Sequence, residues 1–296
     1  MNTQEKQINN LEELIEYLNK LLLDKNHLYV FRGYSKEEEM LPKLIRKNAV
    51  EKEFQLLDCF EKYALRYISN VNGALDLLAY AQHFGLPTRL LDFTYNPYIA
   101  LFFALNSEKQ ENDDPNYYIR YCDVKENVLL NGLPLTSNRS GLSHTGVSLS
   151  KDYHRMVNYL NVGLYNNENN KIACETIFGK ECEQLLTREY FDQNEKEYFG
   201  LSIRNKIEQD KILFLEPPLS NERIIMQQGL FMFPYTLNEE RHKKIYRKST
   251  DIMKFSKNLR GDALRYLDSI GSNTFKLMPD LGNVCMAIQT LLDVKF

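Results

Sequence analysis

The segment from Ala81 to Asn106 constrains the fold most strongly, because it predicts a buried helix next to a strand. Its sequence is AQHFGLPTRLLDFTYNPYIALFFALN. Gly85 ends a preceding helix, and Asn96 followed by Pro97 is typical of a helix start. The helix predicted over Tyr98–Leu105 is apolar on nearly every side, so it has to be buried against other elements. The chain therefore needs a substantial core around this helix.

The rest of the chain predicts both helices and strands. Apolar residues three and four positions apart predict a helix from Asn10 to Lys25, and the same spacing runs from Glu51 to Asn70. The C-terminal segments at 256–271 and 280–292 also have helical spacing. Strands are expected at Arg89–Thr94 and in four further runs, HLYVFRG at 27–33, YYIRYCDV at 117–124, KILFLEPP at 211–218 and ERIIMQQGLFMFP at 222–234.

The domain organisation follows from a compositional change in the middle of the chain. Residues 131–150 are rich in Gly, Ser, Thr and Asn, which predicts a long loop, and residues 151–210 are largely helical in pattern. No repeat and no Gly/Ser linker separates two halves. We therefore expect one α+β domain over residues 1–296, with its core at about 27–124 and 211–296 and a helical and loop insertion at about 125–210.

Charge and composition exclude several classes of protein. The formal net charge is −3, from 37 basic and 40 acidic side chains, so no overall field attracts nucleic acid or an anionic membrane. No stretch has the length of a membrane span, and the N-terminus is too polar for a secretory signal peptide. We expect a cytoplasmic protein with no membrane contact. No metal site is expected either, because the histidines are scattered and no cysteines show metal-ligand spacing.

Arg32 is the first candidate site residue, because it ends an apolar strand and is followed directly by Gly33. A guanidinium in this place suits bidentate recognition of a phosphate or carboxylate, and the glycine lets a ligand or a backbone segment approach closely. A structural ion pair with a carboxylate such as Asp92 accounts for the same residue equally well. The stretch itself leaves both interpretations open.

A second group of candidates, His83, Arg89, Asp92 and Thr94, lies within twelve positions of one another. His83 is in the last turn of a helix, where the helix dipole favours its protonated form, although a histidine there is more often structural. Arg89 and Asp92 are three apart on a strand and point to opposite faces, so Arg89 needs another partner.

Gln228 precedes a glycine in a segment with apolar flanks, where it can form hydrogen bonds at a cleft or simply face water. The same segment contains Glu222 and Arg223. The signatures of phosphate-loop NTPases, dinucleotide-binding folds, zinc proteases and serine hydrolases do not occur in the sequence.

The motifs together resemble those of the bacterial FRG domain family. They occur in the order FRG at 31–33, LPKLIR at 41–46, AQHFGLPTRLLDFTYNPYIALFFA at 81–104, ERIIMQQGLF at 222–231 and LMPDL at 277–281. The resemblance extends from about Leu28 to the C-terminus and is weakest over 125–210. The family name by itself implies no reaction.

A more distant resemblance is to ADP-ribosyltransferases of the arginine–serine–glutamate type. YVFRG looks like their first core strand, LLDFTYNPYIALFFA looks like their second strand and following helix, and ERIIMQQGLF looks like the strand that carries the catalytic glutamate. Arg223 stands where that glutamate is expected. The resemblance implies a mixed or antiparallel β core with a helical N-terminus and C-terminal helices, and it implies a protein that binds or uses NAD.

The resemblance also implies roles for the candidate residues. The catalytic groups are expected to be His83, Asp92, Gln228 and Glu222. The residues expected to bind the nucleotide are Arg32, Gly33, Arg89, Thr94 and Arg223. Such a protein would act as a bacterial toxin or anti-phage effector, with a protein or nucleic acid as its target and an antitoxin or regulator as a further partner.

Two other functions remain open at this point. One is a non-catalytic module that binds a nucleotide or a partner protein through the same cleft. The other is an RNA-directed nuclease-type toxin that uses His83, Arg89 and Asp92. Convergence of Arg32, His83, Asp92 and Gln228 on one pocket would support a nucleotide site.

Overall fold

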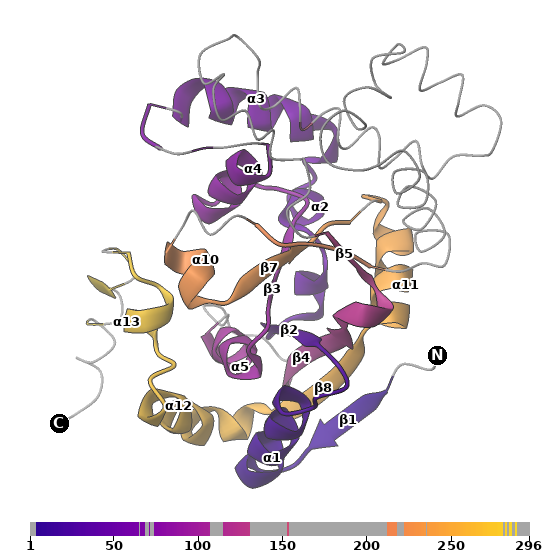
Figure 1. The fold of residues 1–296 in the computed structure, drawn as a ribbon, viewed down its shortest axis with the longest axis vertical. Coiled ribbons are helices and arrows are strands. Elements are labelled where there is room, and N and C mark those ends of the chain that lie inside the picture. The colour runs from indigo at the N-terminus through magenta and orange to yellow at the C-terminus, as the bar shows by residue number, and fades with distance from the viewer. Residues whose placement is uncertain are drawn as a thin grey trace.

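The computed structural model describes residues 4–64, 66–68, 71, 74–106, 115–130, 153, 212–217, 222–234, 236–280, 282, 284, 285 and 288. The predicted loop at 131–150 and all of the predicted helical segment at 151–210 except Tyr153 lie outside them. In Figure 1 a central sheet is surrounded by helices.

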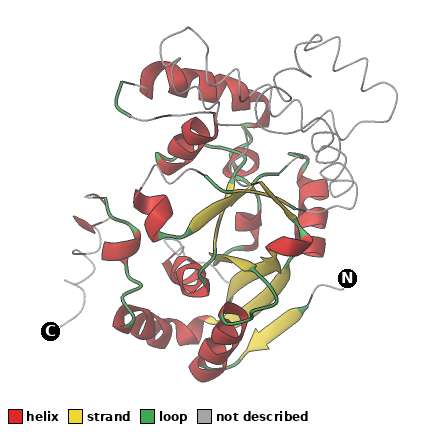
Figure 2. Cartoon of the chain, viewed as in Figure 1, coloured by secondary structure: helices red, strands yellow, loops and turns green. Residues whose placement is uncertain are grey.

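The strands form one mixed sheet of eight strands. They are β1 (Glu5–Ile8), β2 (Tyr29–Tyr34), β3 (Leu91–Thr94), β4 (Asn116–Asp123), β5 (Val128–Leu130), β6 (Leu213–Leu215), β7 (Gly229–Met232) and β8 (Asp251–Ser256), in the order β1-β8-β4-β2-β3-β7-β6-β5. The two edge pairs are parallel and the inner pairs are antiparallel. The predicted mixed α and β architecture is confirmed, and Figure 2 shows the strands at the centre with helices around them.

The helices cover both faces of this sheet. They are α1 (Leu11–Leu22), α2 (Lys43–Arg46), α3 (Glu53–Ala64), α4 (Ala74–His83), α5 (Pro97–Asn106), α10 (Glu222–Met226), α11 (Glu239–Ser249), α12 (Arg260–Ser269) and α13 (Thr274–Leu277). Short 3₁₀ turns lie at Glu37–Met40, Val50–Lys52, Val124–Glu126 and Lys257–Leu259. One sheet face packs on α1, α5 and α12 and, further along, on α3 and α4. The opposite face packs on α11 and on the chain around Met40.

Helix α5 is the most buried helix of the described part and behaves as its sequence predicts. The Asn96 side chain accepts a hydrogen bond from the Tyr98 backbone N–H at 2.9 Å, and Pro97 is the first helical residue. All of its residues from Pro97 to Leu105 are buried except the partly buried Phe103. The same kind of start is confirmed for α1, where the Asn10 side chain accepts from the Glu13 N–H at 2.9 Å.

Strand β2 lies directly under α5, and Gly33 is the point of closest approach. A Cβ added at Gly33 would lie 1.8 Å from the Ala100 carbonyl oxygen and 2.9 Å from the Ala104 nitrogen. These are backbone atoms of α5, so no side-chain movement can make room. The glycine is therefore required by the packing of a helix on the sheet, and the approaching group is protein backbone.

Consecutive residues of β2 point their side chains to opposite faces of the sheet. Phe31 is buried on the α5 face, whereas Val30 is buried on the α11 face. Because side chains alternate along a strand, Arg32 points to the α11 face, away from α5. On β3 the buried Leu91 and Phe93 share this α11 face, and Asp92 points to the other one.

The structure differs from the sequence expectations in several elements. Residues Glu222–Met226 form the helix α10 and not a strand, and the strand β7 begins only at Gly229. Ile224 and Ile225 favour a strand locally, but Ile224 packs on the core formed by α3, α4 and β7. Strand β1 was not expected, and β5, which falls within the predicted insertion, is an edge strand of the sheet.

Candidate functional site

A polar pocket lies between α4, β3, α10 and β7. Its volume is about 70 Å³. Its polar lining consists of Gln82, His83, Asp92, Arg223 and Gln227, and its apolar lining of Ala79, Phe93, Ile224, Gly229, Leu230 and Phe231. Two chain regions that are far apart in sequence, 79–93 and 223–231, thus place their polar side chains around one small space.

Asp92 is the only carboxylate among the residues that line this pocket. It is exposed on β3, and its neighbours Leu91 and Phe93 are buried on the opposite face. The Gln82 side-chain nitrogen donates a hydrogen bond to Asp92 Oδ1 at 2.7 Å. Among the described residues no group bonds to Oδ2, so this oxygen is available to accept a hydrogen bond from a ligand.

His83 is the last residue of α4, as predicted, and it contacts the same pocket. Its ring packs edge-on against the Phe84 ring, with 4.8 Å between the ring centroids. Among the described residues its imidazole has no hydrogen-bond partner. Burial, and secondly the positive charge of Arg223, lower the pKa of His83, while Asp280 opposes this shift. The imidazole is therefore neutral near neutral pH, with one nitrogen that donates and one that accepts, and not the cation that its helix position predicts.

Arg223 supplies the positive charge of the pocket. It is half-buried on α10 and is the only lysine or arginine among the lining residues. A guanidinium next to a carboxylate and a neutral imidazole suits a ligand that carries both an anionic group and hydroxyl groups.

Arg32 does not reach this pocket, because it lies on the other face of the sheet. Its guanidinium donates to two backbone carbonyl oxygens, of Asp92 at 2.7 Å and of Glu39 at 3.0 Å. Its described partners are therefore backbone carbonyls and not the Asp92 carboxylate considered from the sequence. Arg32 binds the Asp92 carbonyl from the α11 face of the sheet and so connects β3 to the turn at Glu37–Met40.

Arg89 has a structural partner. Only 2% of the residue is exposed, and its guanidinium forms a two-pronged ion pair with the buried Glu53 and a further hydrogen bond to the Pro234 carbonyl at 3.2 Å. Burial disfavours its charge, but Tyr153 and Glu53 outweigh this effect and raise the pKa of Arg89. Because the guanidinium is already occupied by protein groups, we leave Arg89 out of the site.

The remaining predicted residues do not line the pocket. Thr94 donates to the Gln227 carbonyl at 2.7 Å and accepts from the Asn96 N–H at 3.0 Å, so it connects β3 to the turn before β7. Gln228 is exposed in this turn, with a positive φ of 46°, and Glu222 is exposed at the start of α10. Gly33 contacts α5, as described above.

Gln82 and Gln227 are the polar lining residues that were not among the predicted site residues. Gln227 points its amide to the Leu277 carbonyl, to which it donates at 2.8 Å, and so joins α13 to the pocket rim. Gln82 directly precedes His83 within the long motif at 81–104, and this position is the feature of the sequence that could have identified Gln82 as a site residue.

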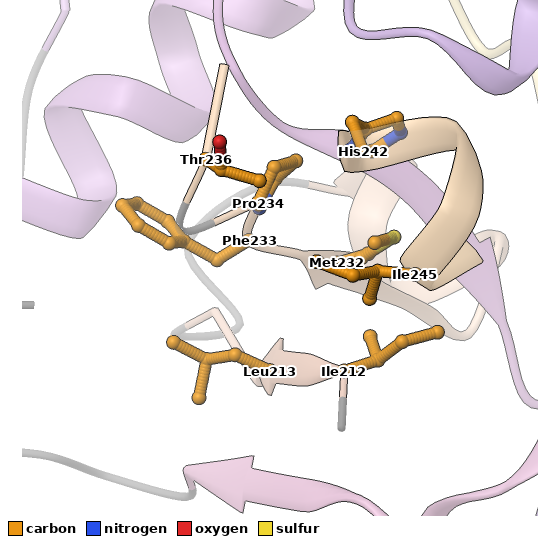
Figure 3. A pocket seen from close by; sticks show the side chains of 8 residues that line it. All are labelled: Ile212, Leu213, Met232, Phe233, Pro234, Thr236, His242 and Ile245. Carbon is orange, nitrogen blue, oxygen red and sulfur yellow. The ribbon is translucent and has the colours of Figure 1, made fainter. Parts of the chain in front are cut away.

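A second hollow is apolar and much smaller, about 10 Å³ (Figure 3). It is lined mainly by Ile212, Leu213, Met232 and Ile245, with His242 at its edge. His242 is buried, and one of its ring nitrogens forms a hydrogen bond with the Met40 carbonyl at 2.9 Å. Burial and the charge of Arg32 lower the pKa of His242, against the effect of this bond, so it is a neutral structural residue. At most one water fits here.

Within the described residues, no group of three or more His, Cys, Asp or Glu side chains is arranged to hold a metal ion. In the same part of the chain, no helix is both long and apolar enough to span a membrane.

Comparison with protein families agrees with the motifs. The family model of the FRG domain matches residues 27–113. The chain contains an FRG domain. The matched part of this domain includes β2, α4, β3 and α5, and so it includes His83 and Asp92 but not Arg223. Comparisons with curated proteins and with solved structures found no match.

The structure gives each letter of the FRG motif a physical role. Phe31 is buried in the core under α5, Arg32 holds the Asp92 carbonyl, and Gly33 admits the backbone of α5. The motif that names the FRG domain therefore supports β3, and the pocket-lining side chains Asp92 and His83 lie on β3 and α4.

Proposed function

We propose that the pocket binds the ribose and phosphate part of NAD and that the protein is an ADP-ribosyltransferase-like enzyme. The observation that carries this proposal is the convergence of Asp92, His83 and Arg223 on one pocket. Pockets for whole small ligands have volumes of about 300 to 1,000 Å³. A space of about 70 Å³ takes only one part of a dinucleotide, and the rest of NAD would lie on the surface outside it.

Each of the three side chains has a role in this proposal. The open oxygen of Asp92 accepts a hydrogen bond from a ribose hydroxyl, and its charge stabilises the positive charge that develops on the ribose as the bond to nicotinamide breaks. Nicotinamide leaves with the electrons of that bond. The neutral His83 takes the proton of the incoming nucleophile, which is water or a group of the target. Arg223 pairs with a phosphate.

In this proposal Asp92 takes the place of the catalytic acid that the sequence comparison did not find at Arg223. Arg223 occupies the expected position of the catalytic glutamate only if the segment is a strand, but this segment is the helix α10. A carboxylate is nevertheless present in the pocket, on the strand β3. We assign the role of the missing acid to Asp92. The biological setting, a toxin or anti-phage effector with a macromolecular target and a regulator, is supported by the distant resemblance alone.

Asp92→Asn is expected to lower the rate of nicotinamide release from NAD by about a hundredfold, the scale typical of losing one group that stabilises charge in the transition state. The amide keeps the shape of the side chain but lacks the charge. The measurement is chromatographic quantification of the nicotinamide that purified protein releases from NAD, with and without a cell extract as a source of targets. Asp262→Asn, at an exposed position on α12, is the matched control and should leave the rate unchanged.

The proposal of an enzyme is wrong if wild-type protein releases no nicotinamide under either condition. Saturable NAD binding without turnover would then leave a non-catalytic nucleotide-binding module. Degradation of RNA in the absence of NAD would instead favour the nuclease-type function.

A further inference from the structure

We propose that Thr88 and Gln82 are positioning residues that orient the Asp92 carboxylate through a directed chain of hydrogen bonds. This inference rests on the proposed role of Asp92 as the carboxylate of the site. Thr88 lies in the loop between α4 and β3, and only 2% of it is exposed. Neither Thr88 nor Gln82 was among the residues singled out from the sequence.

The direction of this series of hydrogen bonds follows from which atom donates and which accepts in each. The Thr88 hydroxyl oxygen accepts a hydrogen bond from the Leu90 backbone N–H at 3.3 Å. Its single proton is donated to the side-chain oxygen of Gln82. The side-chain nitrogen of Gln82 then donates to Asp92 Oδ1 at 2.7 Å. Every link therefore has one donor and one acceptor, from the Leu90 backbone to the carboxylate.

Thr88 selects one of the two orientations of the Gln82 amide. The oxygen and nitrogen of a glutamine amide have nearly the same shape, so packing does not distinguish the two orientations. The reversed amide would place its oxygen against the Asp92 carboxylate, with two acceptors facing each other. The Thr88 hydroxyl favours the orientation in which the nitrogen faces Asp92.

This arrangement fixes Asp92 from two sides. Arg32 holds its backbone carbonyl on one face of the sheet, and Gln82 holds its side chain on the other. Oδ1 is thereby engaged, and Oδ2 is left for the ligand. A carboxylate held in this way loses less conformational freedom when a ribose hydroxyl binds, and it is oriented before the reaction begins.

Thr88→Val tests the chain, because valine keeps the shape of threonine and removes the hydroxyl. We expect kcat for nicotinamide release to fall about tenfold, the effect of one hydrogen bond, with little change in KM. Thr88→Ser retains the hydroxyl and should restore kcat to within about twofold of the wild-type value. Gln82→Met, at a half-buried position, should lower kcat as Thr88→Val does.

A second readout does not depend on NAD. The side-chain amide signals of Gln82 in a ¹⁵N–¹H spectrum should shift in Thr88→Val and stay at their wild-type positions in Thr88→Ser. Unchanged amide signals in Thr88→Val would overturn the inference, and so would equal kcat values for Thr88→Val and wild type. If wild-type protein does not turn over NAD, the proposed function fails, and the amide signals alone decide whether Thr88 orients Gln82.

Discussion

Gly33→Ala is expected to prevent the protein from folding stably. The added methyl group would lie 1.8 Å from the carbonyl oxygen of Ala100, and the strand and the helix α5 would have to separate. Overpacking a core costs about 1 to 3 kcal/mol where side chains can adjust, and occasionally more. Here the obstacle is backbone, so we expect a loss at or above the upper end of that range, which is a large part of the stability of an ordinary domain.

The measurement is urea unfolding followed by circular dichroism. Gly261→Ala is the matched control, because its nearest neighbour, an Arg265 nitrogen, lies 3.8 Å from the added Cβ, and it should be neutral or slightly stabilising. Ala100→Gly should not rescue Gly33→Ala, since the clash involves the Ala100 carbonyl group and not its side chain. A Gly33→Ala protein with wild-type stability would show that α5 does not lie this close to β2.

Glu53→Gln is expected to lower the free energy of unfolding by about 3 to 5 kcal/mol, the usual cost of leaving one partner of a buried ion pair alone. Glu53 and Arg89 are 7% and 2% exposed, and the pair joins the start of α3 to the loop before β3. The amide cannot neutralise the buried guanidinium. The hydroxyl of Tyr153 also donates to this carboxylate and would lose its charged acceptor.

Thermal and urea unfolding of Glu53→Gln measure this loss. Glu51→Gln makes the same chemical change two residues earlier at an exposed position, and it should stay within about 0.5 kcal/mol of wild type. The double variant Glu53→Gln with Arg89→Met should be more stable than the sum of the single effects predicts, because no unpaired charge remains. Additive losses would mean that the two residues do not interact.

The elements that the sequence predicts well are those with strong local signals. Helix α5 has an Asn–Pro start and an uninterrupted apolar stretch, and both features determine its structure directly. Strand β4 and helix α12 were likewise expected from their apolar spacing. The placement of His83 at a helix end and of Asp92 on a strand followed from the Gly–Leu–Pro turn between them.

The errors concern features that depend on distant contacts. The resemblance placed Arg89 among the nucleotide-binding residues, and its buried partner Glu53, 36 positions away, looks from the sequence like a surface residue of an amphipathic helix. The backbone carbonyls that Arg32 contacts carry no signature in the sequence. In α10, the local preference of isoleucine for strands is outweighed by the packing of Ile224 against Gly229 and the neighbouring core.

The pocket itself was partly predictable. His83 and Asp92 were expected to meet, and Arg223 was expected nearby, although from a strand. Arg32 and Gln228 were expected in the same pocket, and the structure places Arg32 on the other face of the sheet and Gln228 in the adjoining turn. Which face a side chain occupies depends on the register of β2 and β3, and this register comes from pairing over more than sixty positions.

The most direct test of the site is a calorimetric titration of NAD into wild-type protein, Asp92→Asn, Arg223→Met and the control Asp262→Asn. The pocket predicts saturable binding to the wild type and to Asp262→Asn, and binding at least about tenfold weaker to each of the other two variants, since each loses a charged contact with the ligand. Absence of saturable NAD binding to the wild type, or equal affinity in all four proteins, would contradict the assignment of this pocket to NAD.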